Sequence, residues 1–293
     1  MSYEPHERLV APARETSSLI RLILGLITTT ILYVVLLGLG SYALKLSMGN
    51  AWVGEIAATG GALTPGQTLA ILGSFSFLII AIGLVIILVH RRNPITLFGG
   101  LAVTTLQFLS AMRGLATYLA LTTIFIFLTE DFRQQLSLVF WLTLLPVSII
   151  FILIQVTAEE LVFRGYIQSQ LAALGAPRAI WILIPSILFG VLHYNPSTMN
   201  DIAPWTALWA VGFGILAADL TARNGTLGPA IAFHFANNFM ALAILGLEDF
   251  LGGLSLFVYP FSVTDTTELA TRLPNEAIGI LVAYLFVRLA MRT

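Results

Sequence analysis

Long apolar runs with almost no charged residues dominate this 293-residue chain. A helix that crosses a bilayer needs about 20 predominantly apolar residues. Inside the hydrocarbon every backbone N–H and C=O must be bonded within the protein, so such runs fold as helices. We therefore predict an all-α membrane bundle of about eight transmembrane helices, with boundaries set to within several residues, at 19–44, 68–89, 112–128, 136–158, 179–194, 205–222, 228–247 and 274–291.

Composition agrees with a polytopic membrane protein and excludes several kinds of site. The chain is 58% hydrophobic and 10% charged, whereas soluble domains carry about 25% charged residues. Cysteine is absent, which excludes disulfides, thiol nucleophiles and cysteine metal sites. The net charge of −1 argues against nucleic acid as a partner. The first apolar run is too long for a cleaved signal peptide, so we expect a retained anchor.

The segments between the predicted spans are expected to be loops or interfacial segments, and they define the parts of the chain. Residues 47–66 and 248–272 read as loops, and the apolar but short stretch 95–110 reads as an interfacial segment leading into the third span, with a re-entrant piece as the alternative. The predicted parts are a cytoplasmic tail at 1–18, transmembrane helices and loops at 19–135, a catalytic core at 136–247, and an outer loop with the final helix at 248–293.

Lysine and arginine set the expected orientation, because they favour the cytoplasmic side. With the N-terminus inside, the outer side receives only Lys45, Arg133 and Arg272. Both termini are then cytoplasmic, in what we expect to be the inner (plasma) membrane of a bacterium. The inner side receives Arg8, Arg14, Arg21, Arg91, Arg92, Arg113, Arg164, Arg178, Arg223, Arg288 and Arg292.

Two adjacent carboxylates and an arginine stand where the fourth span should leave the bilayer: Glu159, Glu160 and Arg164. Each charge costs about 2.5–3.5 kcal/mol near the bilayer centre, so ionisable groups kept there are functional candidates. Glu160 and Arg164 share a helix face at i and i+4. Arg164 is expected to neutralise Glu160, which leaves Glu159, about 100° around the helix, freer to act as a general base for water.

Histidines supply the partners for these carboxylates. His193 and His234 lie inside apolar runs, where each must find a polar partner, whereas His6 and His90 are most simply solvated. His234 and Asn238 share a face at i and i+4 and could donate to a developing oxyanion. Asn237 also lies within reach of His234, so geometry does not force the choice of Asn238. A further i, i+4 pair, Asp219 and Arg223, reads as a structural clamp.

The depth of His193 conflicts with a site at the cytoplasmic membrane face. His193 follows Arg178 by roughly 22 Å of straight helix at 1.5 Å per residue, whereas Glu159 and His234 are expected near the cytoplasmic ends of their spans. Pro177 and Pro185 are expected to delay or kink the start of this helix. On that basis we predict that the three motifs converge.

Three motifs in this order resemble the signature of the CPBP family, which groups CAAX prenyl endopeptidases of the Ras-converting type with bacteriocin-processing and immunity proteins. The family pattern is Glu-Glu-x-x-x-Arg, then Phe-x-x-x-His, then His-x-x-x-Asn. Here it stands as Glu159-Glu160-Leu-Val-Phe-Arg164, Phe189-Gly-Val-Leu-His193 and His234-Phe-Ala-Asn-Asn238. The resemblance covers about residues 136–247.

This resemblance implies an eight-helix intramembrane endopeptidase. By carry-over, Glu159 activates water with help from His193, and His234 and Asn238 stabilise the oxyanion. Glu160, Arg164 and Phe189 support the site. The substrate is expected to be a peptide or membrane-protein segment that enters from the cytoplasmic side. The lipid bilayer is the other expected partner.

The need for a metal stays open at this point. Family members were long called metalloproteases and are now usually viewed as glutamate-dependent. Two histidines and a glutamate could hold Zn²⁺ with an open position. However, the chain has no His-Glu-x-x-His helix, and asparagine is a poor zinc ligand, so we favour a site with no metal and no cofactor, with zinc as the alternative.

Two other functions compete with proteolysis. A non-catalytic membrane partner, such as an immunity protein, would keep the fold without the reaction. A proton- or ion-coupled transporter would use Glu159 and Glu160 as carriers, but inverted repeats and paired broken helices are expected there and the sequence shows none.

Overall fold

The computed structural model describes residues 3–58, 64–247 and 249–292, and this part of the chain is mostly helical. Its helices are α1 (Glu7–Arg14), α2 (Leu19–Met48), α3 (Asn50–Ala58), α4 (Pro65–Leu88), α5 (Leu101–Thr129), α6 (Leu138–Glu160), α7 (Ser169–Ala173), α8 (Arg178–Leu192), α9 (Pro196–Met199), α10 (Ala203–Asn224), α11 (Gly228–Phe239) and α12 (Thr266–Met291). Two π-helical segments, Leu161–Gln168 and Met240–Ile244, extend α6 and α11, and short 3-10 turns stand at Glu4–His6, Pro94–Phe98, Asn200–Ile202 and Gly252–Leu254.

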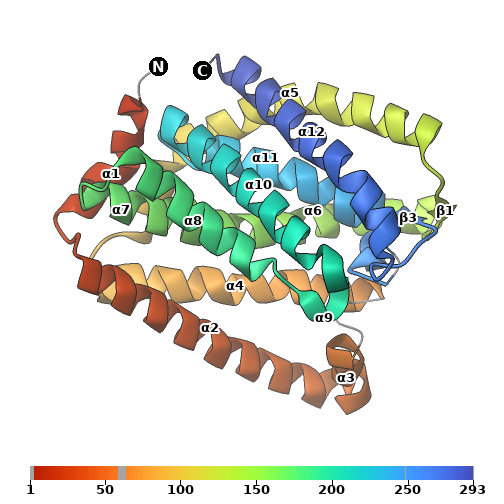
Figure 1. Cartoon of the computed structure of the whole chain (residues 1–293). Helices are drawn as coiled ribbons and strands as arrows, with labels where there is room; N and C mark the ends of the chain where they lie inside the picture. Colours follow the sequence, from red (N-terminus) through yellow and green to blue (C-terminus); the bar gives the residue numbers. More distant parts are fainter. Residues whose placement is uncertain (1–2, 59–63, 248, 293) are drawn as a thin grey trace.

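Helices α2, α4, α5, α6, α8, α10, α11 and α12 run alternately in opposite directions through the bundle (Figure 1). Both ends of the chain lie at one end of it (Figure 1). The other end carries a small sheet of three strands, β1 (Arg133–Gln134), β2 (Leu245–Leu247) and β3 (Phe257–Tyr259), in the order β1-β3-β2. Strand β3 pairs antiparallel with β1 and parallel with β2, with Arg133 opposite Val258 and Leu245 opposite Phe257.

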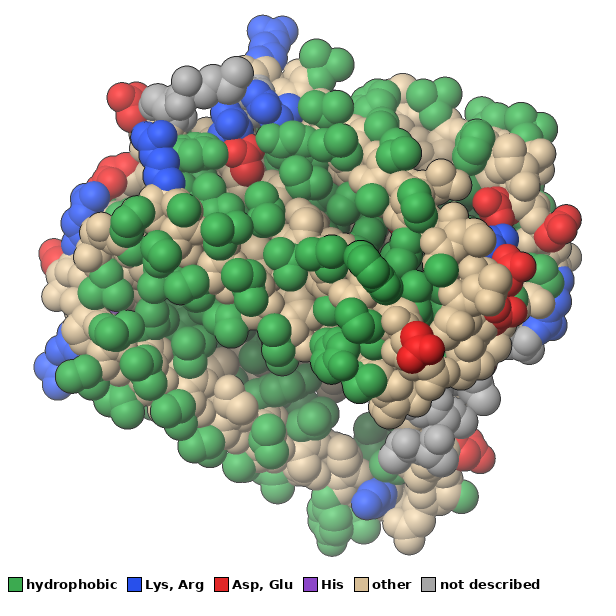
Figure 2. Space-filling view, viewed as in Figure 1, with side chains coloured by type: hydrophobic (Ala, Val, Ile, Leu, Met, Phe, Trp, Pro, Cys, Tyr) green, Lys and Arg blue, Asp and Glu red, His purple; other side chains and the backbone are tan. Residues whose placement is uncertain are grey.

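Six helical runs in the described residues are long and apolar enough to cross a membrane, and α8 is a shorter apolar helix of 15 residues. Apolar side chains cover most of the face seen in Figure 2, with charged side chains gathered towards its edges. The protein is therefore an integral membrane protein. Each predicted span corresponds to a helix, but α11 has only 12 residues, so the count of eight crossings stays a prediction, as does the cytoplasmic location of the termini.

Local sequence explains where the helices start and stop. Ser18 and Ser137 cap α2 and α6 by accepting the backbone N–H of Arg21 and Phe140, and Thr64 with Gln67 forms a capping box at α4. Gly225 ends α10 in the left-handed region at φ 70°. A Cβ at Gly225 would lie 2.0 Å from the Pro5 carbonyl oxygen, so only glycine lets the N-terminal segment approach this turn.

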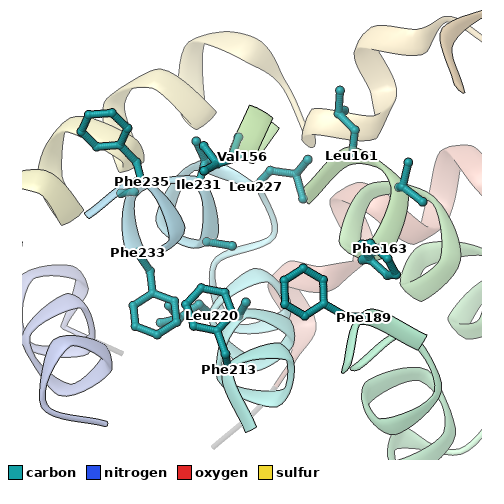
Figure 3. Packing of buried hydrophobic residues seen from close by; sticks show 14 of the residues in the cluster. Val156, Leu161, Phe163, Phe189, Phe213, Leu220, Leu227, Ile231, Phe233 and Phe235 are labelled. Carbon is teal, nitrogen blue, oxygen red and sulfur yellow. The ribbon is translucent and has the colours of Figure 1, made fainter. Parts of the chain in front are cut away.

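Helix α11 occupies the centre of the bundle, between α5, α6, α10 and α12 (Figure 1). Every residue from Gly228 to Ala236 is buried. Aromatic rings fill the space around it: Phe213 stacks on Phe233 with centroids 4.6 Å apart, and Phe189 lies on the other side of Phe213 (Figure 3). This central helix carries His234, so the core packing itself holds that ring in place.

Several predicted boundaries differ from the structure. Part of the predicted loop 47–66 forms α3, while 59–63 lie outside the described residues. The stretch 95–110 is not separate from the third span: α5 begins at Leu101, after Gly99 and Gly100 with positive φ break the chain direction. The last three residues of the predicted span 228–247 form β2. The fourth span does not end at 158, because one helical run continues from Leu138 to Ala173.

The prediction that His6 and His90 are solvated is wrong. The His6 side chain is buried against the Trp181 ring, with centroids 4.7 Å apart. The His90 ring is fully buried, and its Nε2 lies 2.9 Å from the Tyr166 hydroxyl. The sequence placed His6 in a polar tail and His90 at a helix end, but the N-terminal segment folds back onto α8 and α10. The end of α4 packs against the segment after α6.

The predicted clamp between Asp219 and Arg223 is present, at 2.5 Å. Asp219 also accepts the hydroxyls of Tyr3, at 2.5 Å, and Tyr284, at 2.7 Å. One carboxylate thus ties the N-terminal segment and α12 to α10. Of the arginines assigned to the inner side, Arg113 lies within α5 and Arg164 is buried in the core.

We expect acidification to destabilise the fold through the two buried histidines. Burial lowers the pKa of His6 and of His90 to about 4, and the charges of Arg92 and Arg21 contribute at His90. Between pH 6.5 and about 4 the unfolded chain therefore binds more protons than the folded one, so stability decreases as pH falls through this window. Thermal unfolding in detergent from pH 7.5 to 4 measures the slope. Replacing His6→Phe should flatten it, and an unchanged slope would contradict the assignment.

Candidate active site

The Glu159–Arg164 motif lies inside a continuous helical run, not at its end. The run extends over 36 residues, Leu138–Ala173, and residues 161–168 within it are π-helical and all buried. π-Helical turns are rare and frequent at functional sites. The helix therefore continues past the predicted end of the fourth span at 158, through this buried π-helical segment, while the point at which it leaves the bilayer stays a prediction.

This continuation brings His193 beside the Glu pair. Helix α8 begins at Arg178, so the expected late start does not occur, and His193 directly follows its last residue. The α6 run and α8 form an antiparallel hairpin about the turn at residues 174–177. Glu159 and His193 stand at similar distances along the chain from that turn, each roughly 20 Å away, and both line one cavity.

A buried ion pair forms the floor of the site. Arg164 Nη1 donates to Glu160 Oε1 at 2.9 Å, and both side chains are fully buried. Arg164 Nη2 also donates to the Gly214 carbonyl oxygen at 3.2 Å, and the guanidinium lies 4.9 Å from the centre of the Phe189 ring. The pair predicted from i, i+4 spacing is thus present, while Arg164 Nε and Glu160 Oε2 have no hydrogen-bond partner among the described residues.

His234 is held between the two glutamates. Its Nδ1 lies 2.9 Å from Glu160 Oε1, and its Nε2 lies 3.5 Å from Glu159 Oε2. Because a carboxylate only accepts hydrogen bonds, the contact to Glu160 assigns a proton to Nδ1. Glu160 therefore orients both Arg164 and His234, while Glu159 Oε2 has no hydrogen-bond partner among the described residues.

Phe189 and His193 form the opposite wall. His193 Nδ1 lies 2.8 Å from the Phe189 carbonyl oxygen, so this nitrogen donates and Nε2 keeps its lone pair. The Phe189 ring contacts His193 with centroids 4.4 Å apart and meets the His234 ring edge-on at 5.9 Å. The buried Phe189 ring therefore packs against both histidine rings.

Asn238 is oriented by two further amides. Its Nδ2 donates to Gln155 Oε1 at 2.7 Å, and its Oδ1 accepts from Asn237 at 3.1 Å. One N–H of the Asn238 amide remains for a substrate. Sequence reasoning missed Gln155, although it precedes Glu159 by four residues and so shares its face.

A cavity of about 50 Å³ joins these groups, large enough for a few water molecules. Sequence reasoning also missed two aromatic residues that line it, Trp209 and Phe213, whose apolar setting offers no signal of a site. The cavity is lined by Gln155, Glu159, Phe189, His193, Trp209, Phe213, His234, Asn237 and Asn238.

No group of three or more His, Asp or Glu side chains within the described ranges is arranged to hold a metal ion. Glu160 is already bonded to Arg164 and His234, so only Glu159, His193 and His234 offer ligand atoms to the cavity. The preference for a metal-free site stays a prediction.

Comparison with known proteins agrees with the motif resemblance. Residues 140–240 match the family described as type II CAAX prenyl endopeptidase Rce1-like. The chain is also 32% identical over 126 residues to the uncharacterized protein YyaK of Bacillus subtilis (strain 168), which covers 42% of each chain. The chain thus spans less than half the length of this relative. No solved structure gives a significant match. The resemblance predicted from the three motifs is thus confirmed over residues 140–240, where the chain is similar to this family.

Proposed function

We propose that this Rce1-like membrane protein is an endopeptidase that hydrolyses a peptide bond within the membrane, using Glu159 to activate water. The single observation that carries the proposal is the cavity on which Glu159, His193, His234 and Asn238 converge from three separate helical segments, α6, α8 and α11. Protease activity also agrees with the family match. The substrate is a peptide or a membrane-protein segment, and the membrane is the inner (plasma) membrane of a bacterium.

In the proposed mechanism Glu159 accepts a proton from water as the water oxygen attacks the carbonyl carbon. The Oε2 of Glu159 has no hydrogen-bond partner among the described residues and lies 3.5 Å from His234 Nε2, which suits this role, and His193 Nε2 assists by orienting the same water. After the tetrahedral intermediate forms, Glu159 returns the proton to the leaving nitrogen as the C–N bond breaks.

The oxyanion accepts hydrogen bonds from His234 Nε2 and from Asn238 Nδ2. Donation from Nε2 requires a ring protonated on both nitrogens, and Glu160 and Glu159, which flank the ring, stabilise that positive charge. Glu160 and Arg164 are positioning residues, since they reach the substrate only through His234.

The proposal is tested by comparing protein termini in membranes of cells that make the wild-type chain or the Glu159→Gln variant at matched abundance. New termini found only with the wild type would support a protease and would name its substrates. Identical termini, with the variant still complementing a deletion, would overturn proteolysis and favour a non-catalytic membrane partner.

A further inference from the structure

A second, larger cavity adjoins the proposed catalytic cavity. It has a volume of about 330 Å³ and lies between α5, α10, α11, α12 and the segment around the sheet. Trp209 and Asn237 line both cavities. Phe233, next to His234 in the chain, forms part of its wall. A substrate bound with its carbonyl at His234 would therefore have a side chain within reach of this space.

The walls of the larger cavity are mostly apolar, with charged groups on α12. Phe233, Met240, Leu242 and Ile280 supply apolar surface, whereas Glu276 supplies a carboxylate. Trp209 stands at the boundary, and its indole N–H has no hydrogen-bond partner among the described residues. The junction thus offers a donor to a substrate carbonyl.

The arginine nearest to Glu276 is already paired with other carboxylates. Arg272, one turn earlier on α12, donates to Glu130 at 2.9 Å and to the Glu268 carboxylate. Its guanidinium also lies 4.4 Å from the centre of the Phe261 ring. Arg272 therefore balances at most one of the three carboxylates in this region.

Glu276 itself forms no ion pair within 4.0 Å in the described part of the chain. Its side chain is exposed, and it stands two residues inside the predicted span 274–291. A carboxylate near the end of a span costs less than one at the bilayer centre, but a neighbouring cation still stabilises it. Among the described residues no cation pairs with Glu276 within 4.0 Å, and Glu276 lines a cavity of about 330 Å³.

We propose that this cavity is a substrate subsite for a basic side chain, with Glu276 as its counterion. Lysine and arginine carry a charged head on an apolar stem. The stem would lie along Phe233 and Ile280, and the head would reach Glu276. Glu276 is then a specificity-determining residue for the cleavage proposed above, on which this assignment rests.

Binding to an inactive protein tests the subsite without any need for cleavage. The Glu159→Gln variant in nanodiscs is titrated with two peptides, acetyl-Ala-Ala-Arg-Ala-Ala-amide and the same peptide with citrulline, which keeps the shape of arginine but is neutral. We expect the arginine peptide to bind at least about tenfold tighter, corresponding to about 1.4 kcal/mol. Adding Glu276→Gln should bring the two affinities together.

A matched control is the same change at the exposed Glu15, and Glu15→Gln should keep the preference for arginine. Thermal unfolding of Glu276→Gln checks folding, and its Tm should not fall, because the variant removes an unpaired charge. Equal affinity of both peptides for the parent protein, including no measurable binding of either, would overturn the subsite, as would a preference that survives Glu276→Gln. The comparison of protein termini tests the proposed proteolysis separately, so failure of that function can be distinguished from failure of the subsite.

Discussion

Replacing Glu159 by glutamine should lower the turnover of the purified protein by about 10²- to 10⁴-fold, the usual contribution of a general base. Glutamine keeps the size of the side chain but cannot accept the proton from water. The folded state should be unaffected, because Glu159 is 13% exposed to the cavity and its Oε2 has no hydrogen-bond partner in the described structure.

The measurement is the initial rate on a substrate identified from the termini, in proteoliposomes, together with Tm. Glu15→Gln is the matched control and should retain full activity. If Glu159→Gln kept a tenth or more of the wild-type rate with the same Tm, Glu159 would not be the base, and His193 would become the first residue to replace.

Replacing Glu160 by leucine should destabilise the protein by about 3–5 kcal/mol, the cost of leaving a buried charge without its partner. Glu160 and Arg164 are both fully buried, and Glu160 also accepts from His234 Nδ1. The loss of this one carboxylate therefore leaves a guanidinium and an imidazole without their acceptor in the core.

The double variant Glu160→Leu with Arg164→Met should be more stable than Glu160→Leu alone, because replacing both members of a buried pair removes the uncompensated charge. Equilibrium unfolding in mixed micelles measures both free energies. The double variant should remain inactive, since His234 has lost its orienting carboxylate. The single variant Arg164→Met completes the comparison. If the double variant lost as much stability as the two single variants together, the pair would not be energetically coupled.

Local spacing was enough to predict part of the site. The i, i+4 relation placed Arg164 against Glu160 and Asp219 against Arg223, and both ion pairs are present. The 100° offset separated Glu159 from Glu160, and in the structure one lines the cavity while the other is buried in the floor. These relations hold because a helix fixes the angle between neighbouring side chains whatever surrounds it.

Sequence patterns led to wrong predictions for side chains whose burial depends on segments far away in the chain. His6 and His90 were expected in water because their neighbours are polar, yet long-range packing buries both. Asn238 was assigned with His234 alone, whereas Gln155, 83 residues away, accepts from its amide. Neither contact has a local signal, since each depends on which helices become neighbours.

The sequence by itself therefore determined the membrane-embedded helices, the three motifs and the ion pairs within a helix, because apolar length and helical period are local properties. Only the tertiary structure decided that the α6 run continues through its π-helical segment, that His193 meets Glu159 across the hairpin, and that Glu276 lines a cavity without a counterion. These features arise from the packing of α5, α6, α8, α10, α11 and α12 on one another, and such packing depends on contacts between residues far apart in the chain.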